Sequence, residues 1–342
     1  MSNFFAAVPH VIDDGPVNGR CHGCQNDEDN RAVLVDATGI AGVDNSIVRA
    51  FRYQVCAHCG TLDLMLDAGN EAALYGDGYY SFEDKEPSYV ERQVIEIRNR
   101  YELSGRGVVG RMISKVWPGP HHRALRPLLD ATIAPPLQRS SRILDVGCGA
   151  GKWLKELAEL GFTDLTGIDP FMPTVAASDN IRLIKGDIQD IDETFDLVTI
   201  HHAFEHIPNG EVALRALKSK LSENGVLIVR IPLGASYGWR TFGGNWVQLD
   251  PPRHAHLYST AGMTELATRV GLETRDVSFD ATSFMVTGSE ATLVGMRPHT
   301  GQPIASLGTQ GVFGWVRSRR IAALANSLGS ADQAAFYFTA KT

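Results

Sequence analysis

The run SRILDVGCGAGKWLKELAELG, residues 141–161, carries the clearest structural signal in the chain. Its opening residues RILDV have the apolar pattern of a short strand, and KWLKELAEL repeats apolar side chains at helical spacing. Gly161 follows as a residue that ends a helix. The glycine turn DVGCGAG lies between strand and helix. This order predicts the first half of a doubly wound α/β unit, whose ligand binds outside the carboxyl ends of the strands.

Later segments continue the alternation of strand and helix. Four runs contain a short apolar strand: 164–170, 181–191, 194–208 and 225–232. A helix is predicted within 210–225, and this alternation is typical of a parallel sheet. Residues 283–331 read as an insertion with helical runs. The final run AAFYFTAKT, 334–342, could close the sheet as an antiparallel strand at its edge.

The glycine turn also indicates its ligand. Gly147, Gly149 and Gly151 form G-x-G-x-G, whereas the dinucleotide fingerprint is G-x-G-x-x-G. Asp145 precedes the turn, and a carboxylate there repels a pyrophosphate but balances a cationic ligand. S-adenosylmethionine is such a ligand, because its sulfonium and ammonium groups are positive and it has no phosphate. We therefore favour S-adenosylmethionine over a nicotinamide cofactor.

Carboxylates end the next two predicted strands. Asp169 ends the second strand and is suited to hold both ribose hydroxyls. Asp187, followed by Ile188, ends the third and is suited to accept from the adenine amino group. His201 ends the fourth strand and is expected to line the cofactor. The carboxyl ends of parallel strands meet at one edge of a sheet, so these side chains should lie together.

Four of the five cysteines form two C-x-x-C pairs: Cys21 with Cys24, and Cys56 with Cys59. Two such turns complete a tetrahedral S₄ shell for Zn²⁺. Disulfides are disfavoured in a reducing compartment, and a redox C-x-x-C does not need two copies. We expect a structural zinc ribbon, because a closed Cys₄ shell leaves no open position for catalysis.

Residues 140–260 resemble a class I S-adenosylmethionine-dependent methyltransferase. The resemblance rests on LDVGCGAG, the strand ending in Asp169, the GDI run and FDLVTIHHAFEHI. The whole chain is similar to zinc-ribbon-bearing sugar C-methyltransferases and surface-polysaccharide methyltransferases, in which a ribbon and a Tyr-rich loop precede the enzyme domain. The resemblance implies a seven-stranded sheet and the cofactor roles given above for Gly147, Gly149, Asp169 and Asp187. It also places Tyr79 and Tyr80 at the substrate.

The segment HAFEH, 202–206, matches the H-x-x-E-H pattern of some zinc proteases. That pattern requires a helix, but here it follows a strand directly and Pro208 comes two residues later. We expect a strand-end loop instead, in which His202, Glu205 and His206 serve catalysis. Packing alone is an equally good account of any single one of them.

The segment NWVQLDPPRHAHLYS, 245–259, should reach the same cleft, with its prolines limiting the freedom of the loop. A neutral histidine near its ordinary pKa of about 6.5 can take the acceptor's proton, so His254 is the candidate base. In the sugar C-methyltransferases a carboxylate precedes this histidine, and here Arg253 takes its place. That difference disfavours C-methylation, and Arg253 could bind an acceptor phosphate or carboxylate.

Composition sets the remaining expectations. The chain has 342 residues and a net charge of −7, which argues against nucleic-acid binding. Without a signal or membrane-span pattern, we expect a cytoplasmic protein. We divide it into a ribbon (1–75), a helical substrate-side segment (76–140) and a methyltransferase domain (141–342).

The leading hypothesis is a methyltransferase that O-methylates a sugar or a polysaccharide or natural-product precursor. The acceptor would be a small molecule or a glycan, nucleotide-linked or lipid-linked. Sugar C-methylation is the alternative within this class. A nicotinamide-dependent oxidoreductase and an inactive zinc-ribbon interaction protein are the alternatives from other classes. The pattern does not indicate the oligomeric state.

Overall fold

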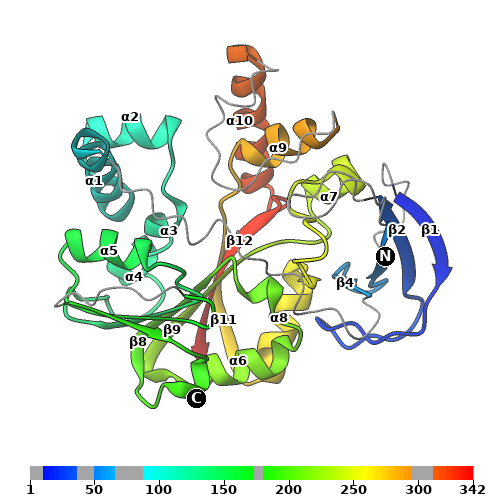
Figure 1. Ribbon diagram of the computed structural model, residues 1–342, viewed down its shortest axis with the longest axis horizontal. Helices are drawn as coiled ribbons and strands as arrows, with labels where there is room; N and C mark the ends of the chain where they lie inside the picture. Colours follow the sequence, from blue (N-terminus) through cyan, green and yellow to red (C-terminus); the bar gives the residue numbers. More distant parts are fainter. Residues whose placement is uncertain (1–10, 37–49, 66–87, 173–179, 294–310, 342) are drawn as a thin grey trace.

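The computed structural model describes residues 11–36, 50–65, 88–172, 180–293 and 311–341. Its main element is a seven-stranded sheet in the order β11-β12-β9-β8-β5-β6-β7 (Figure 1). The strands are β5 (Arg142–Val146), β6 (Asp164–Asp169), β7 (Ile181–Lys185), β8 (Phe195–His201), β9 (Leu221–Pro232), β11 (Leu272–Phe279) and β12 (Gln333–Ala340). Strands β5 to β9 pair in parallel. The predicted doubly wound, mostly parallel, seven-stranded fold is confirmed.

The position predicted for the last strand is wrong. β12 is antiparallel as expected, but it lies between β9 and β11 rather than at the edge. Its side chains alternate between two cores, because Phe336 and Phe338 face one side of the sheet while Tyr337 faces the other. A strand buried on both faces has a continuous apolar pattern, which does not distinguish an inner position from an edge.

Helices cover both faces of the sheet. On one face, α6 (Gly210–Ser219) and α8 (Thr260–Arg269) supply Leu214, Leu217, Met263 and Leu266 to the core. On the other face, α4 (Arg126–Leu129) and α5 (Lys152–Glu159) supply Leu128, Leu154 and Leu157. Gly161 follows α5 with a φ of 96° and ends it as predicted.

Further helices lie before the sheet, between β9 and β10, and after β11. They are α1 (Tyr89–Ser104), α2 (Val108–Val116), α3 (Pro120–Arg123), α7 (Tyr237–Phe242), α9 (Phe284–Leu293) and α10 (Gly311–Ser327), with short 3₁₀ turns η3 (Ile188–Asp190), η4 (Phe204–His206) and η5 (Gly243–Asn245). Ser88 caps α1 and forms a capping box with Glu91. Within the described ranges, every helix is too short or too polar to cross a lipid bilayer.

The cysteine-rich region forms a second sheet in the order β1-β2-β3-β4-β10. β1 (Val11–Pro16), β2 (Arg31–Asp36), β3 (Ala50–Val55) and β4 (Leu62–Leu64) come from the N-terminal region, whereas β10 (His256–Leu257) comes from the loop after β9. β10 pairs antiparallel with β4, so that His256 lies opposite Asp63. The loop containing His254 is therefore built into the ribbon sheet. The domain division at residues 75 and 140 stays a prediction.

Candidate functional site

The glycine turn adopts a backbone that only glycine takes easily. Gly147, Gly149 and Gly151 have φ of 72°, 55° and 73°. A Cβ on Gly147 would lie 2.6 Å from the Cβ of Ala203, which follows β8. The turn is thus packed closely against the end of the neighbouring strand, and no larger residue fits at Gly147.

The carboxylate of Asp169 holds this turn in place. Its Oδ2 accepts a hydrogen bond from the Gly149 amide at 3.0 Å, and its Oδ1 accepts one from the Phe171 amide at 2.8 Å. Asp169 is 8% exposed at the end of β6, beside the end of β5. It therefore lies where the resemblance places the ribose contact, and it also fixes the shape of the turn.

Asp145 is buried at the end of β5. Its Oδ1 accepts a hydrogen bond from the Thr199 hydroxyl at 2.8 Å. Burial raises the pKa of Asp145 to about 7, against the effect of that hydrogen bond. A positively charged ligand beside this carboxyl group would favour its ionised form.

The remaining predicted cofactor residues lie along the same edge. Asp187 follows β7 and caps η3, where Oδ1 accepts from the Gln189 amide at 3.2 Å, and Ile188 is partly buried behind it. His201 ends β8 with both ring nitrogens buried and without a hydrogen-bond partner in the described residues. Its ring lies edge-on to Trp153 of α5 at 5.0 Å between centroids. Unpaired buried nitrogens call for a ligand or a water molecule.

Arg230 on β9 binds His202 at the start of the turn that follows β8. Its Nη1 approaches His202 Nε2 at 2.6 Å and His121 Nε2 at 3.2 Å, while its Nε donates to Asp280 Oδ2 at 2.6 Å. A guanidinium only donates, so both histidine nitrogens accept. The Nε2 lone pair of His202 is thereby occupied, which weakens the case for His202 as the base.

Sequence reasoning missed this cluster. Its only signal is an arginine inside the apolar strand GVLIVRIP, since a charge buried in a sheet needs partners. His121 on α3 comes from the segment assigned to the substrate side, with nothing in the sequence to link it to β9.

Glu205, His206 and His254 come together in a second cluster. His254 Nε2 lies 3.9 Å from Glu205 Oε1, and the rings of His206 and His254 are 4.9 Å apart between centroids. His254 Nδ1 contacts the Gln248 carbonyl at 2.7 Å. Burial lowers the pKa of His254 to about 4, below the ordinary value expected from the sequence. The imidazole is therefore in its basic form at neutral pH.

The segment HAFEH contains only the short 3₁₀ turn η4. His202 has a φ of 50°, in the left-handed region, so no helix runs across the motif. His202 faces Arg230 and His206 faces the loop, where its Nδ1 contacts the Arg253 carbonyl at 2.8 Å. The expected strand-end loop is confirmed, and the protease-type helix is excluded.

Arg253 forms an ion pair with Asp250 in the same loop. Asp250 Oδ2 also lies 3.9 Å from His254 Nε2. A substrate anion at Arg253 would share its guanidinium with Asp250. Tyr79 and Tyr80, the other predicted substrate residues, lie outside the described residues.

Asp63 fixes the loop to the ribbon. Its Oδ1 contacts His256 Nδ1 at 2.8 Å, and its Oδ2 accepts from the His22 amide at 3.1 Å. Burial alone would raise the pKa of Asp63, but His22 and His256 outweigh it and lower the pKa. The Ala255 amide then donates to the Glu205 carbonyl at 2.9 Å, so the loop joins the ribbon to the turn after β8.

The four predicted metal cysteines converge next to Asp63, which accepts from the amide of His22 in the first C-x-x-C turn. The Sγ atoms of Cys21 and Cys59 are 3.6 Å apart, and those of Cys24 and Cys56 are 3.5 Å apart. All four thiols are free of disulfides. Tetrahedral ligands at about 2.3 Å from a zinc ion lie about 3.8 Å from one another, so these separations fit an S₄ shell.

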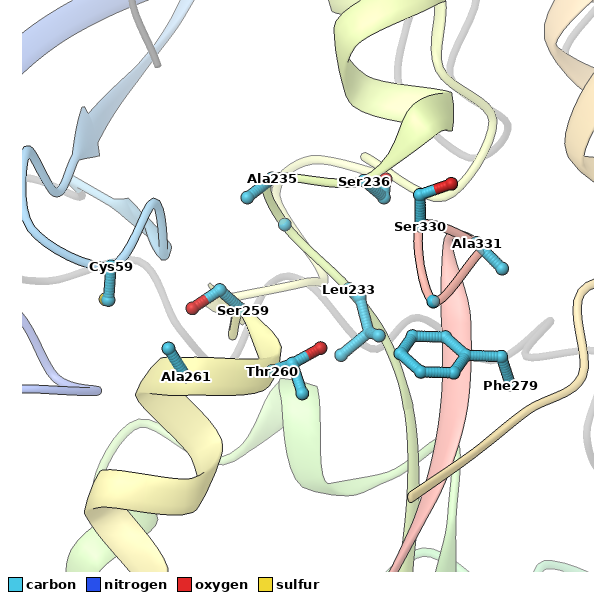
Figure 2. Close-up of a pocket in the computed structure, with 12 residues that line it drawn as sticks. Cys59, Leu233, Ala235, Ser236, Ser259, Thr260, Ala261, Phe279, Ser330 and Ala331 are labelled. Atoms are coloured by element: carbon cyan, nitrogen blue, oxygen red, sulfur yellow. The ribbon is translucent and has the colours of Figure 1, made fainter. Parts of the chain in front are cut away.

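A separate pocket lies where the ribbon, the end of β9 and the start of α8 meet (Figure 2). Cys59, Leu233, Thr260, Phe279 and Ser330 are among its lining residues, and none of the lining side chains is charged. It includes neither the glycine turn nor the histidines, so it contributes no acid–base group to the site.

Residues 121–277 match the family model described as "Methyltransferase domain". This segment is a methyltransferase domain. The chain is 28% identical over 156 residues to the ubiquinone biosynthesis O-methyltransferase of Bradyrhizobium diazoefficiens, covering 41% of this chain and 60% of that protein. It is 25% identical over 225 residues to the trans-aconitate 2-methyltransferase of Deinococcus radiodurans, covering 61% of this chain and 81% of that protein.

Among solved structures, the S-adenosylmethionine-dependent methyltransferase of Mesorhizobium loti matches with a TM-score of 0.39 and 14% identity, covering 64% of this chain and 99% of that chain. The chain spans 60% of the length of the Bradyrhizobium protein, and the ribbon lies outside the family match.

Replacing Asp169 with alanine should weaken cofactor binding. The change removes the two hydrogen bonds that hold the glycine turn and the proposed ribose contact. We expect a loss of about 1.5–3 kcal/mol, the worth of hydrogen bonds to a charged group. Calorimetry with S-adenosylhomocysteine measures it, with Asp164→Ala at the opposite end of β6 as control. Unchanged affinity in Asp169→Ala would remove Asp169 from the site.

Proposed function

We propose that the whole chain is an S-adenosylmethionine-dependent methyltransferase that O-methylates a hydroxyl on a sugar or on a polysaccharide or natural-product precursor. The glycine turn held by Asp169, beside a histidine–carboxylate cluster, carries the proposal. The curated relatives support methyl transfer to oxygen, since one of them is named as an O-methyltransferase. The sugar acceptor rests on the resemblance described under Sequence analysis.

Each of the proposed cofactor residues along the sheet edge binds a different part of S-adenosylmethionine. Gly147 and Gly149 let the backbone approach the methionine part, Asp169 holds the ribose and Asp187 with Ile188 holds the adenine. Asp145 and His201 complete the pocket near the positive end of the cofactor. The cofactor supplies an activated methyl group, so the residues around it mainly have to bind and orient.

In the transfer itself, the acceptor oxygen forms a bond to the methyl carbon while the carbon–sulfur bond breaks, and that bond's electron pair stays on sulfur. The acceptor's proton has to leave. We assign the activation of the acceptor hydroxyl to His254, which would take up the proton at Nε2 or orient the hydroxyl. The Nδ1 of His254 is engaged by the Gln248 carbonyl, and its ring is neutral at neutral pH. Glu205, His206 and His202 support this group.

C-methylation is a second candidate, because two carboxylates lie near His254 in the fold. The sequence lacks the carboxylate before His254, but the fold places Glu205 Oε1 and Asp250 Oδ2 each 3.9 Å from His254 Nε2. These carboxylates could replace the missing one. A tritiated-methyl screen against nucleotide sugars and lipid-linked glycans, followed by NMR of the product, identifies the acceptor and the methylated atom. The absence of transfer to any hydroxyl or carbon acceptor would count against the function.

We also propose a structural zinc ion at Cys21, Cys24, Cys56 and Cys59. The S₄ donor set and the separations of its sulfur atoms support zinc, and thiols stay reduced in the cytoplasm, where we place the enzyme. When bound, the zinc holds the two knuckles together. The ribbon presents Asp63 to His256, so zinc supports the acceptor side of the site indirectly.

Elemental analysis should therefore find one zinc ion per chain fewer in Cys21→Ser than in the wild type. Zinc binding is coupled to ribbon folding, so the variant should lose protection of β1 to β4 in hydrogen exchange. Affinity for S-adenosylhomocysteine should hardly change, since the ribbon does not reach the glycine turn. Wild-type protein without zinc, with four titratable thiols in the folded state, would contradict the assignment.

Replacing His254 with alanine should lower turnover by about 10²–10⁴-fold, the usual worth of general acid–base catalysis. Because the pKa of His254 is about 4, the wild-type rate should rise with pH below the usual histidine range. Cofactor affinity should stay unchanged, because the loop lies beyond the glycine turn. His202→Ala and His206→Ala are the matched comparisons. Full activity in His254→Ala with an inactive His202→Ala would make the loop a lid only.

A further inference from the structure

The carboxylate of Glu205 is fully buried, and neither of its oxygens accepts a hydrogen bond from the described residues. Its Oε1 lies 3.5 Å from His202 Nδ1 and 3.9 Å from His254 Nε2. Burying a carboxylate is unfavourable unless a cation or well-placed hydrogen-bond donors lie beside it. Glu205 therefore indicates a ligand at this position.

The histidines next to Glu205 are oriented by backbone carbonyls. His254 Nδ1 donates to the Gln248 carbonyl at 2.7 Å, and His206 Nδ1 donates to the Arg253 carbonyl at 2.8 Å, since a carbonyl oxygen only accepts. In His254 this places the lone pair of the neutral ring on Nε2, which faces Glu205. A metal-binding histidine usually donates its other ring N–H to a carbonyl or carboxylate, which fixes the tautomer and the ring orientation.

We propose that Glu205, His206 and His254 bind a divalent transition-metal cation. One ligand atom from each of the three residues lies within 4.8 Å of the others. Tetrahedral ligands at about 2.1 Å from a metal ion lie about 3.4 Å apart. The 3.9 Å between His254 Nε2 and Glu205 Oε1 is close to that separation, so small side-chain rotations complete the site.

The surrounding charges fit a cation. Glu205 supplies a fully buried carboxylate to the ligand group. Metal binding requires an imidazole with a free lone pair, and His254 Nε2 lies on the side of the ring that faces Glu205. Asp250 adds a second carboxylate 3.9 Å from His254 Nε2. Arg253 is the opposing charge, and its guanidinium is directed at Asp250 by their ion pair.

The donor set predicts the kind of metal and its role. Two imidazoles and one carboxylate suit Zn²⁺, Co²⁺ or Fe²⁺, whereas the four thiolates of the ribbon form a closed site. Three protein ligands leave coordination positions open, as in catalytic sites. We assign an open position to the acceptor's oxygen, a step that rests on the proposed function. His254 would then orient the acceptor through the cation instead of taking its proton.

Cobalt titration of the full chain tests the site. Zinc-loaded protein is washed with a chelator, its ribbon zinc is checked by elemental analysis, and Co²⁺ binding is followed by calorimetry and visible absorption. We expect one Co²⁺ per chain, without the sulfur-to-metal charge-transfer band that cobalt in the ribbon would give. Glu205→Gln and His254→Ala should each weaken Co²⁺ binding more than the loss of a group that only orients a ligand, which costs about 10–100-fold.

His202→Ala is the matched control, since His202 also approaches Glu205 but lies outside the ligand group. It should keep Co²⁺ binding. S-adenosylhomocysteine affinity shows whether each variant is folded, and His206→Ala replaces any variant that is not. No Co²⁺ binding by wild type, wild-type binding in a folded Glu205→Gln, or equal losses in His202→Ala and His254→Ala would overturn the metal site. Methyl transfer without Co²⁺ binding would overturn it while leaving the proposed function intact.

Discussion

Two hydrogen bonds to the buried carboxylate of Asp63, from the ring of His256 and the backbone amide of His22, join two parts of the chain that lie far apart in sequence. Hydrogen bonds to a charged group are worth about 1.5–3 kcal/mol each, enough to hold an irregular loop against its conformational entropy. The antiparallel pairing of β10 with β4 places His256 opposite Asp63 in the same region. His254, two residues before His256, is therefore positioned by the ribbon as well as by the sheet.

The site is consequently assembled from two supports of different kinds. The cofactor side depends on the backbone of one strand–turn–helix unit, where Asp169 binds the amides of Gly149 and Phe171. The acceptor side depends on side chains brought together from the turn after β8 and the loop after β9, with Ala255 bonded to the Glu205 carbonyl. Under the proposed function, the acceptor side could change while the cofactor side stays fixed, and the ribbon would support the acceptor side through His256.

The fold around the glycine turn could be predicted because its determinants are local. Strand, glycine turn, helix and the following Asp169 lie within thirty residues, and their spacing alone places them at one sheet edge. The S₄ cluster is also predictable, because two C-x-x-C turns have few alternatives. The predicted position of β12 was wrong because the sequence of an apolar strand does not indicate which strands it pairs with.

The acceptor side could be predicted only in part. His254, Glu205 and His206 were identified as single candidates, but their proximity depends on β10, a strand of two residues whose partner is 193 residues away. Such a strand has no periodicity to detect. Arg230 occupies His202 Nε2, which favours His254 over His202 as the base. This tertiary contact joins residues 28 positions apart, and no local sequence pattern predicts it.

Calorimetry with S-adenosylhomocysteine and with NAD on the full-length chain tests the central claim most directly. The edge formed by Asp145, Gly147, Asp169 and Asp187 predicts saturable binding of S-adenosylhomocysteine at one site per chain and no binding of NAD. The Asp145 carboxyl group disfavours a pyrophosphate, and the turn lacks the glycine spacing that cradles one. Binding of NAD with no heat from S-adenosylhomocysteine would contradict the account.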